Sequence, residues 1–315
     1  MKKTISPFML SGTLYMPAVR DDIADVIMHN KIPGLRSLVI CLEDAVTDED
    51  VPLALQKLRS LLNDIAHRKN DDNGCAGPLV FIRPRNEQMG RELVTSYQLK
   101  GVNGFVLPKF TRETLPCWWS LMEHTDLLLM PTLETHDVYD VKLMTELADT
   151  LLDHPCRRRI LALRIGGNDL MSVIGMRHPR SMTLYEGPLG YVIKMLVAVF
   201  APRGFYLTAP VCELIDNPAI LSREIELDAA HGLVGKTAIH PRQLDVIHNG
   251  FMVDPDDHED AVNILNSVKA VFKSQGAMCE PATHSRWAAA TLERARYTGI
   301  RPTTGMDNVL IVARQ

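Results

Sequence analysis

The sequence predicts a (β/α)8 TIM barrel followed by a C-terminal helical extension. Eight short apolar runs, separated by segments long enough to hold helices, occupy most of the chain before about residue 241. The runs are aliphatic on both faces, as is typical of parallel strands that are covered on both sides. A doubly wound sheet is the main alternative, but it would show a G-x-G-x-x-G turn after the first strand, and residues 12–20 lack one.

The eight runs define the expected strands in order. They are residues 12–18, 37–43, 78–84, 104–109, 127–134, 160–167, 205–211 and 231–241. We expect the barrel domain to cover residues 1–255. Residues 256–315 would form the extension, with helices at 257–275 and 284–297, and would pack on the barrel or on a neighbouring subunit. The most polar stretch, residues 67–77, is predicted to be an exposed loop.

Composition excludes several classes of function. The formal net charge of −4 gives no electrostatic reason to expect a nucleic acid partner, and no apolar run is long enough to span a membrane. Prolines and glycines interrupt the apolar N-terminus, so we do not expect a signal peptide. The six cysteines are scattered without a zinc-like spacing, which is typical of free thiols in a reducing compartment. We therefore expect a cytoplasmic protein.

Charged residues recur where the expected strands end. In a parallel barrel the active site forms at the carboxyl ends of the strands, so this recurrence indicates a site at that end. The residues concerned are Arg20, Glu43, Asp44, Arg83, Arg85, Lys109, Glu134, Asn168, Asp169, Cys212, Glu213, Lys236 and His240.

Glu134 and Asp169 are the expected metal ligands. Carboxylates at the mouths of neighbouring strands can share a hard cation, and oxygen-only ligands favour Mg²⁺, with Mn²⁺ as the alternative. Asp169 could instead cap the helix that follows the sixth strand.

The third strand carries two arginines in an otherwise apolar run. Arg83 and Arg85 could each grip a substrate carboxylate in a bidentate fork, or form an ion pair with Glu43 or Asp44 on the adjacent strand. Strand alternation places both arginines on one face, so their spacing does not choose between these roles. We expect Lys109 to form ion pairs rather than a Schiff base, and Lys236 and His240 to be structural.

Six motifs occur in the order of a known family. They are LEDAV (42–46), IRPRN (82–86), LPK (107–109), PTLET (131–135), GGNDL (166–170) and GLVGKTAIHPRQL (232–244). Over roughly residues 8–265 the chain resembles the citrate lyase beta-subunit-like branch of the HpcH/HpaI aldolase family. The resemblance implies a (β/α)8 barrel that assembles as a homo-oligomer, a trimer or a hexamer.

The resemblance also implies roles for individual residues. Glu134 and Asp169 would bind magnesium, and the arginine of the third strand, Arg83 or Arg85, would hold a substrate carboxylate. Arg20 would make a second anion contact. The other two acids, Glu43 and Asp44, would act beside the metal through water and orient both the waters and the arginine, so that Arg83, Glu43 and Asp44 form the catalytic group.

The chain also departs from the family pattern. Cys41 replaces the first aspartate of the usual DLEDAV, Asn168 stands where an acid often precedes the metal-binding aspartate, and RPRN is a loose match to R-x-N. Residues 279–300 differ from the lid of members that cleave acyl-coenzyme A. These departures indicate a divergent subgroup and leave open whether the substrate is a coenzyme A thioester.

The expected activity is that of a magnesium-dependent carbon–carbon lyase acting on a small carboxylate. The bond would lie next to a hydroxylated carbon that bears a carboxylate, as in a citryl or malyl thioester, and an oxo acid would be released. The general base is unassigned, with Asp307 in the tail as one candidate. The alternatives are a class II pyruvate-type aldolase acting on a free hydroxy-oxo acid, and a non-catalytic binding or assembly relative.

Overall fold

A computed structural model describes residues 5–67 and 77–302, and the chain divides into two units, residues 1–247 and 248–315. The expected polar loop falls largely on residues 68–76, which lie outside the described ranges, as does Asp307. Among the described residues, no helix is both long enough and apolar enough to cross a membrane.

The first unit is built on one parallel sheet whose strands follow the order β7-β6-β5-β4-β3-β2-β1-β8. The strands are β1 (Ser11–Pro17), β2 (Ser37–Cys41), β3 (Leu79–Arg83), β4 (Gly104–Leu107), β5 (Leu128–Leu133), β6 (Leu163–Ile165), β7 (Leu207–Thr208) and β8 (Gly235–Ala238). Thr13 on β1 pairs with Ser37 on β2 and with Thr237 on β8. Backbone hydrogen bonds from Val234 to Leu207 and from Ala209 to Gly235 join β7 to β8, so the sheet closes into a barrel.

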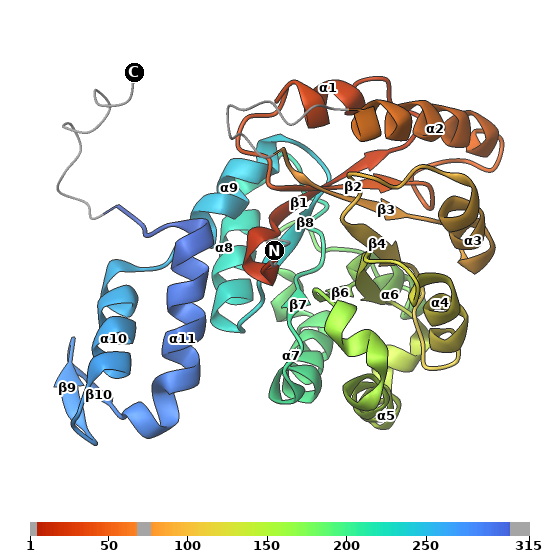
Figure 1. The fold of residues 1–315 in the computed structure, drawn as a ribbon. Coiled ribbons are helices and arrows are strands. Elements are labelled where there is room, and N and C mark those ends of the chain that lie inside the picture. The colour runs from red at the N-terminus through yellow and green to blue at the C-terminus, as the bar shows by residue number, and fades with distance from the viewer. Residues whose placement is uncertain (1–4, 68–76, 303–315) are drawn as a thin grey trace. The chain divides into compact units, whose positions relative to one another are not determined.

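Helices connect successive strands and surround the barrel (Figure 1). They are α1 (Ile23–Met28), α2 (Val51–His67), α3 (Glu87–Ser96), α4 (Leu115–Met122), α5 (Val141–Asp153), α6 (Gly167–Val173), α7 (Pro188–Phe200), α8 (Pro218–Ala230) and α9 (Arg242–Gly250). Side-chain caps define several helix starts. Asn86 accepts from the backbone of Met89 at 3.0 Å in α3, and Asp140 accepts from Lys142 at 2.8 Å in α5.

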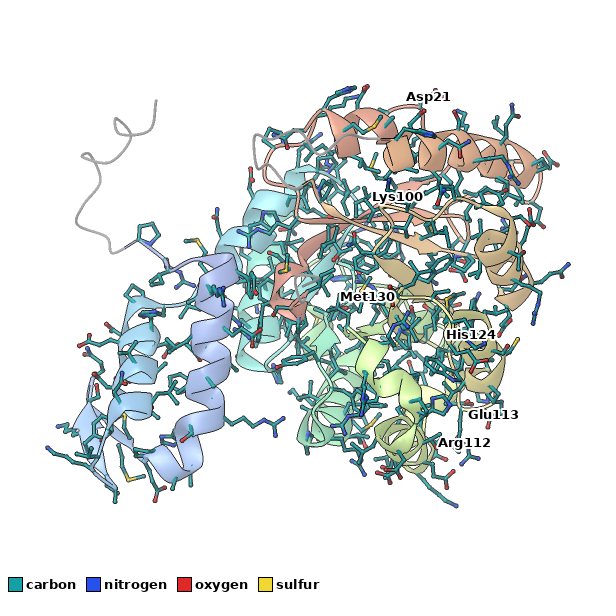
Figure 2. All side chains as sticks on the ribbon, viewed as in Figure 1. Asp21, Lys100, Arg112, Glu113, His124 and Met130 are labelled. Carbon is teal, nitrogen blue, oxygen red and sulfur yellow. The ribbon has the colours of Figure 1, made fainter. Side chains whose placement is uncertain are left out.

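The eight predicted strands are confirmed. Continuous burial explains their composition, since Leu38, Val39 and Ile40 of β2 are all inaccessible to solvent. In β5, Met130 lies among the strands of the barrel (Figure 2) and is equally buried. The expected strands at 160–167, 205–211 and 231–241 were too long, because only three, two and four of their residues form the ladders of β6, β7 and β8.

The second unit contains α10 (Pro255–Asn266), a hairpin of β9 (Phe272–Ser274) and β10 (Ala277–Cys279), and α11 (Pro281–Thr298). The prediction of a helix over 257–275 was therefore wrong beyond Asn266. The hairpin turns at Gln275 and Gly276, whose φ values of 45° and 83° match a two-residue turn with both central residues left-handed. The expected domain boundary at 255/256 falls at the start of α10, eight residues beyond the last residue of the first unit.

Candidate active site

A cavity of about 290 Å³ opens at the carboxyl ends of the barrel strands. Its charged lining residues are Asp44, Arg83, Glu134, Arg164 and Asp169, which come from β3, β6 and the segments that follow β2, β5 and β6. A larger cavity, of about 1030 Å³, is lined by the segments that precede β4, β5 and β6. It therefore lies at the amino-terminal end of the strands, where residues of a barrel contribute to stability rather than to catalysis. The charged cavity is therefore the candidate active site.

Arg83 is the central cation of this cavity. Its Nη2 donates to both carboxylate oxygens of Glu134, at 3.0 and 3.2 Å, and its Nε donates to Glu43. The carboxylate of Asp44 lies 3.8 Å away. Burial alone would lower the pKa of Arg83, but the surrounding negative charges, with Glu134 first, hold it above its ordinary value. Arg83 is thus permanently charged and held in one orientation.

Glu134 follows β5 and is almost fully buried. Its Oε1 accepts from the backbone N–H of Lys109 at 2.7 Å, and Lys109 takes a φ of 45° at this point. Burial raises the pKa of Glu134 to about 7. The positive charge of Arg83 opposes this shift, and the negative charge of Asp169 adds to it. A Cβ atom at Gly166 would clash with the Glu134 side chain, so the glycine makes room for this carboxylate.

Asp169 lies in the first turn of α6 and lines the same cavity. The residue at the N-cap position of α6 is Gly166 and Asp169 lies three residues further on, so the interpretation of Asp169 as the N-cap is wrong. Burial raises the pKa of Asp169, and the charge of Asp44 raises it further. The two expected metal ligands, Glu134 and Asp169, therefore share one cavity and repel each other.

Glu43 and Asp44, which follow β2, have different surroundings. Glu43 is buried between Arg83 and the ammonium of Lys109, whose Nζ lies 3.2 Å from Glu43 Oε1. Its pKa is raised by burial, although both cations oppose the shift. Asp44 has a side chain that is 63% exposed and lines the cavity. The ion-pairing role expected for Lys109 is confirmed.

Arg85 and Arg20 do not line the cavity. Because β3 ends at Arg83, Arg85 does not share its face; it donates to the backbone oxygens of Leu42 and Val46 and to Asp48, which holds the segment after β2. Arg20 forms a forked pair with Asp22, at 2.8 and 2.7 Å, on the exposed surface. Of the three arginines expected to bind substrate, the structure brings Arg83 to the cavity.

Sequence reasoning missed Arg164 of β6, which also lines the cavity. Its guanidinium donates to Thr237 Oγ1 on β8 at 2.5 Å and lies 5.2 Å from the ring centre of Tyr15 on β1. The signal was present in the sequence, because an arginine in the apolar run ILALRIGG is as unusual as the arginine that marked β3.

A second polar cluster joins Lys236 of β8 to residues of α8 and of the segment between α6 and α7. Lys236 donates to Asp228 at 3.0 Å and lies 3.1 Å from Glu224, which also accepts from His178 at 2.8 Å. His178, Cys212 and Glu224 have ligand types that could hold a metal. Oε1 of Glu224 accepts from His178 and from the backbone of Leu184, and Lys236 neutralises the carboxylate at 3.1 Å from Oε2, so this cluster is read as structural, as expected for Lys236.

Comparison with known proteins agrees with this fold. Residues 4–300 match the family described as "C-C_Bond_Lyase of the TIM-Barrel fold". A (3S)-malyl-CoA thioesterase of Cereibacter sphaeroides is 25% identical over 251 residues, 79% of each chain. The chain belongs to this carbon–carbon bond lyase family, and its resemblance to the citrate lyase beta-subunit-like branch is confirmed.

Solved structures show the same fold at low sequence identity. A citrate lyase from Burkholderia xenovorans LB400 superposes with a TM-score of 0.70 at 16% identity, covering 96% of both chains. Protein CitE from Mycobacterium tuberculosis, solved with magnesium, acetoacetate and coenzyme A, gives a TM-score of 0.64 at 20% identity, covering 91% of this chain and 98% of that one. The (β/α)8 barrel predicted from the sequence is thus confirmed.

Proposed function

We propose that the protein is a magnesium-dependent lyase that cleaves or forms a carbon–carbon bond next to a hydroxylated carbon bearing a carboxylate. The observation that carries the proposal is the convergence of Glu134 and Asp169 beside Arg83 in one cavity at the carboxyl end of the barrel. The family of the chain and the magnesium in the complex of CitE from Mycobacterium tuberculosis support the same reaction class.

The acids of the cavity fit a divalent cation. Glu134 and Asp169 offer oxygen ligands, the kind that Mg²⁺ prefers. Together with Glu43 and Asp44 they make four carboxylates, which outnumber the cations Arg83, Lys109 and Arg164 around them. Burial, together with the neighbouring negative charges, raises the pKa of Glu134 to about 7, and a bound cation would relieve the repulsion. Glu134 and Asp169 would therefore hold the ion.

Arg83 is placed to orient the substrate carboxylate. Its Nε and Nη2 are engaged by Glu43 and Glu134, whereas Nη1 makes only a 3.5 Å contact with Thr132. Beyond this long hydrogen bond, Nη1 can donate to a carboxylate bound next to the acids. Because ion pairs on both sides fix the guanidinium, it would hold that carboxylate without further reorganisation.

Asp44 is the candidate for the group that accepts the hydroxyl proton. It lines the cavity with a side chain that is 63% exposed, and the ion pair that the structure gives it, with Arg83, is long at 3.8 Å. When bound, magnesium would supply a Lewis acid that polarises the hydroxyl and the developing oxo group. Loss of the proton from the hydroxyl breaks the adjacent carbon–carbon bond, and the departing half leaves as an enolate that takes up a proton.

Thioester hydrolysis is the second candidate activity, and one observation favours it. The relative from Cereibacter sphaeroides is named a malyl-CoA thioesterase, and it matches 79% of this chain. We propose a thioester of a hydroxy acid as the first substrate class to assay, with a free hydroxy-oxo acid as the alternative. An assay that measures both products distinguishes the two reactions, because carbon–carbon bond cleavage releases the oxo acid and thioester hydrolysis releases the free thiol.

Calorimetric titration with oxalate, a stable mimic of an oxo-acid enolate, tests the proposal. We expect oxalate to bind only when magnesium is present and to lose at least about 100-fold in affinity in Glu134→Gln and Asp169→Asn. Asp149→Asn, on the outer surface in α5, is the matched control and should bind like the wild type. Magnesium-independent binding, or unchanged binding in both cavity variants, would exclude this metal site.

A further inference from the structure

The proposed reaction needs a group that gives a proton to the departing enolate. Among the acids of the cavity, Asp44 is the candidate that takes up the hydroxyl proton, and Glu134 and Asp169 would hold the ion. The lining arginines keep their protons at neutral pH. Of the residues that line the cavity, Tyr15 of β1 and Cys41 of β2 remain as side chains with an acidic hydrogen.

Tyr15 lies on the inner face of β1, towards the carboxyl end of the barrel. Thr13, two residues earlier on the same face, pairs in register with Thr237 of β8, which lines the cavity. Tyr15 is the next inward-facing residue of β1 beyond this pair, and it lines the same cavity. It is partly buried, whereas Thr13 is almost completely buried. The side chain of Tyr15 is therefore accessible to a molecule bound in the cavity.

The hydroxyl of Tyr15 makes a hydrogen bond with the guanidinium of Arg164, whose central carbon lies 5.2 Å from the centre of the Tyr15 ring. A guanidinium has only donors, so the phenolic oxygen accepts this bond and its own proton remains to be donated. Among the residues that the structure describes, no acceptor for that proton is found. The proton of Tyr15 is consequently available to a molecule that occupies the cavity.

Arg164 is suited to stabilise the phenolate that this donation would leave. Only 2% of the residue is exposed, and within the described ranges it forms no ion pair. Its other hydrogen-bond partners are neutral, since Nη2 donates to Thr237 Oγ1 at 2.5 Å and Nη1 to the sulfur of Met130 at 3.9 Å. Because buried charges are normally paired, a negative charge on Tyr15 would give Arg164 a close counter-charge.

Cys41 is less suited to the same role. Burial raises the pKa of its thiol, although the charge of Arg83 opposes the shift, so the thiolate that proton donation would leave is disfavoured. A phenolate at Tyr15 would instead face Arg164, and its charge would also act on Arg83. Tyr15 is therefore the better placed donor of the two.

We infer that Tyr15 is a catalytic residue that donates its hydroxyl proton to the enolate formed when the carbon–carbon bond breaks, and that Arg164 is a positioning residue that stabilises the phenolate. The inference rests on the proposed function and names the proton donor that this function leaves open. The electron pair of the enolate forms the new C–H bond, and the pair of the broken O–H bond stays on the phenolic oxygen. The proton that Asp44 takes from the substrate hydroxyl then returns to Tyr15 through water, so no proton is gained or lost overall.

Hydrogen exchange tests this assignment, because the group that protonates the enolate carbon must also remove that proton in the reverse direction. The probes are pyruvate and the acetyl thioester of N-acetylcysteamine, each incubated with the protein and magnesium in D₂O, and proton NMR follows the entry of deuterium into their methyl groups. We expect the wild type to exchange at least one probe, and Tyr15→Phe to exchange it at least about 100-fold more slowly. Tyr191→Phe, which changes a tyrosine of α7 that is 68% exposed, is the matched control.

Oxalate titration of the same variants separates a role in proton transfer from a structural role. Tyr15→Phe keeps the ring, so we expect it to bind oxalate with magnesium within about threefold of the wild type. Arg164→Met should also slow the exchange, and Arg164→Lys, which keeps the charge, should slow it less. Tyr15→Phe combined with Arg164→Met should be no slower than Tyr15→Phe alone, because the two residues act as a unit.

Unchanged exchange in Tyr15→Phe would overturn the inference, as would a wild type that exchanges neither probe. A larger loss in Cys41→Ser than in Tyr15→Phe would assign the proton to the thiol, and equal losses of exchange and oxalate affinity in Tyr15→Phe would show a structural role. If Tyr15→Phe does not fold, Arg164→Met and Arg164→Lys measure the same step. Any of the contrary results together with magnesium-dependent oxalate binding would refute this inference and leave the proposed function standing.

Discussion

The Nη2 of Arg83 lies 3.0 and 3.2 Å from the two carboxylate oxygens of Glu134, and both side chains are almost completely buried. Glu43 contacts the same guanidinium from the adjacent strand end. One cation therefore compensates two buried acids at the mouth of the barrel. The proposed metal site and the stability of the barrel consequently depend on the same residue.

Replacing Arg83 with methionine should lower the free energy of unfolding of the metal-free protein by about 3–5 kcal/mol, because it leaves buried carboxylates without their counter-charge. Urea denaturation at neutral pH measures the change. Arg85→Met is the matched control, since its partners are two backbone oxygens and an exposed aspartate, and it should cost less. Equal losses in the two variants would show that the acids beside Arg83 are not charged.

Gly166→Ala should disable the cavity with little effect on the fold. The backbone of Gly166 has a φ of −87°, which alanine adopts readily, but the new Cβ would clash with the Glu134 side chain. We expect magnesium-dependent oxalate binding to weaken by at least about tenfold while the melting temperature changes little. Gly187→Ala, with a φ of −108° and 3.9 Å from the new Cβ to the nearest heavy atom, is the matched control and should bind oxalate normally.

Lys236→Met should destabilise the protein much more than Arg164→Met, although both remove a buried cation. Lys236 neutralises Glu224 and Asp228, so its loss should cost about 3–5 kcal/mol of unfolding free energy. Arg164 has no ion pair within the described residues, so its loss should cost less than about 1 kcal/mol or should stabilise the protein. Thermal and urea unfolding of the two variants, measured in parallel, decide this. A large loss in Arg164→Met would reveal a counter-charge.

His178 should make stability depend on pH above neutrality. Burial would lower its pKa, but Cys212 and Glu224 beside it raise the pKa to about 10 in the folded chain, against an ordinary value of 6.5. The folded state therefore holds this proton more tightly than the unfolded state. Its stabilising contribution is complete below about pH 6.5 and is lost as the pH rises towards about 10.

Urea denaturation between pH 6.5 and 10 measures this dependence. The free energy of unfolding should fall over that range in the wild type by roughly a few kcal/mol, and the fall should be much smaller in His178→Gln. His240→Gln is the matched control, because His240 accepts only from the backbone of Arg242 at the start of α9. An identical decline in wild type and His178→Gln would place the titrating group elsewhere.

In the C-terminal unit, the local sequence pattern was insufficient to predict the secondary structure. The stretch 257–275 has helix-like periodicity, yet the helix ends at Asn266 and β9 begins at Phe272. The two left-handed residues at 275 and 276 decide the hairpin, and only one of them, Gly276, is a residue type that marks such a turn. The antiparallel pairing of β9 with β10, which the helix-like pattern does not show, determined the outcome.

The sequence by itself determined the (β/α)8 fold and the end of the barrel at which the charged residues lie. Continuous apolar runs predict parallel strands, because both faces of such strands are covered by other parts of the protein. Residues just after the strands are the candidates for catalysis, because the carboxyl ends of all barrel strands meet at one end. These patterns assign Glu43, Asp44, Arg83, Glu134 and Asp169 to the carboxyl end of the barrel from the sequence alone. Each of these inferences needed only the order of residues along one strand.

Only the tertiary structure decided which of these side chains face one another. It turned Arg85 towards the segment after β2, left Arg20 with Asp22, and placed Asp169 inside the cavity rather than at a helix cap. It also brought Arg164 across the barrel to Thr237, a residue 73 positions away in the chain. Such relationships depend on strand register and barrel closure, which bring together residues that no local spacing connects.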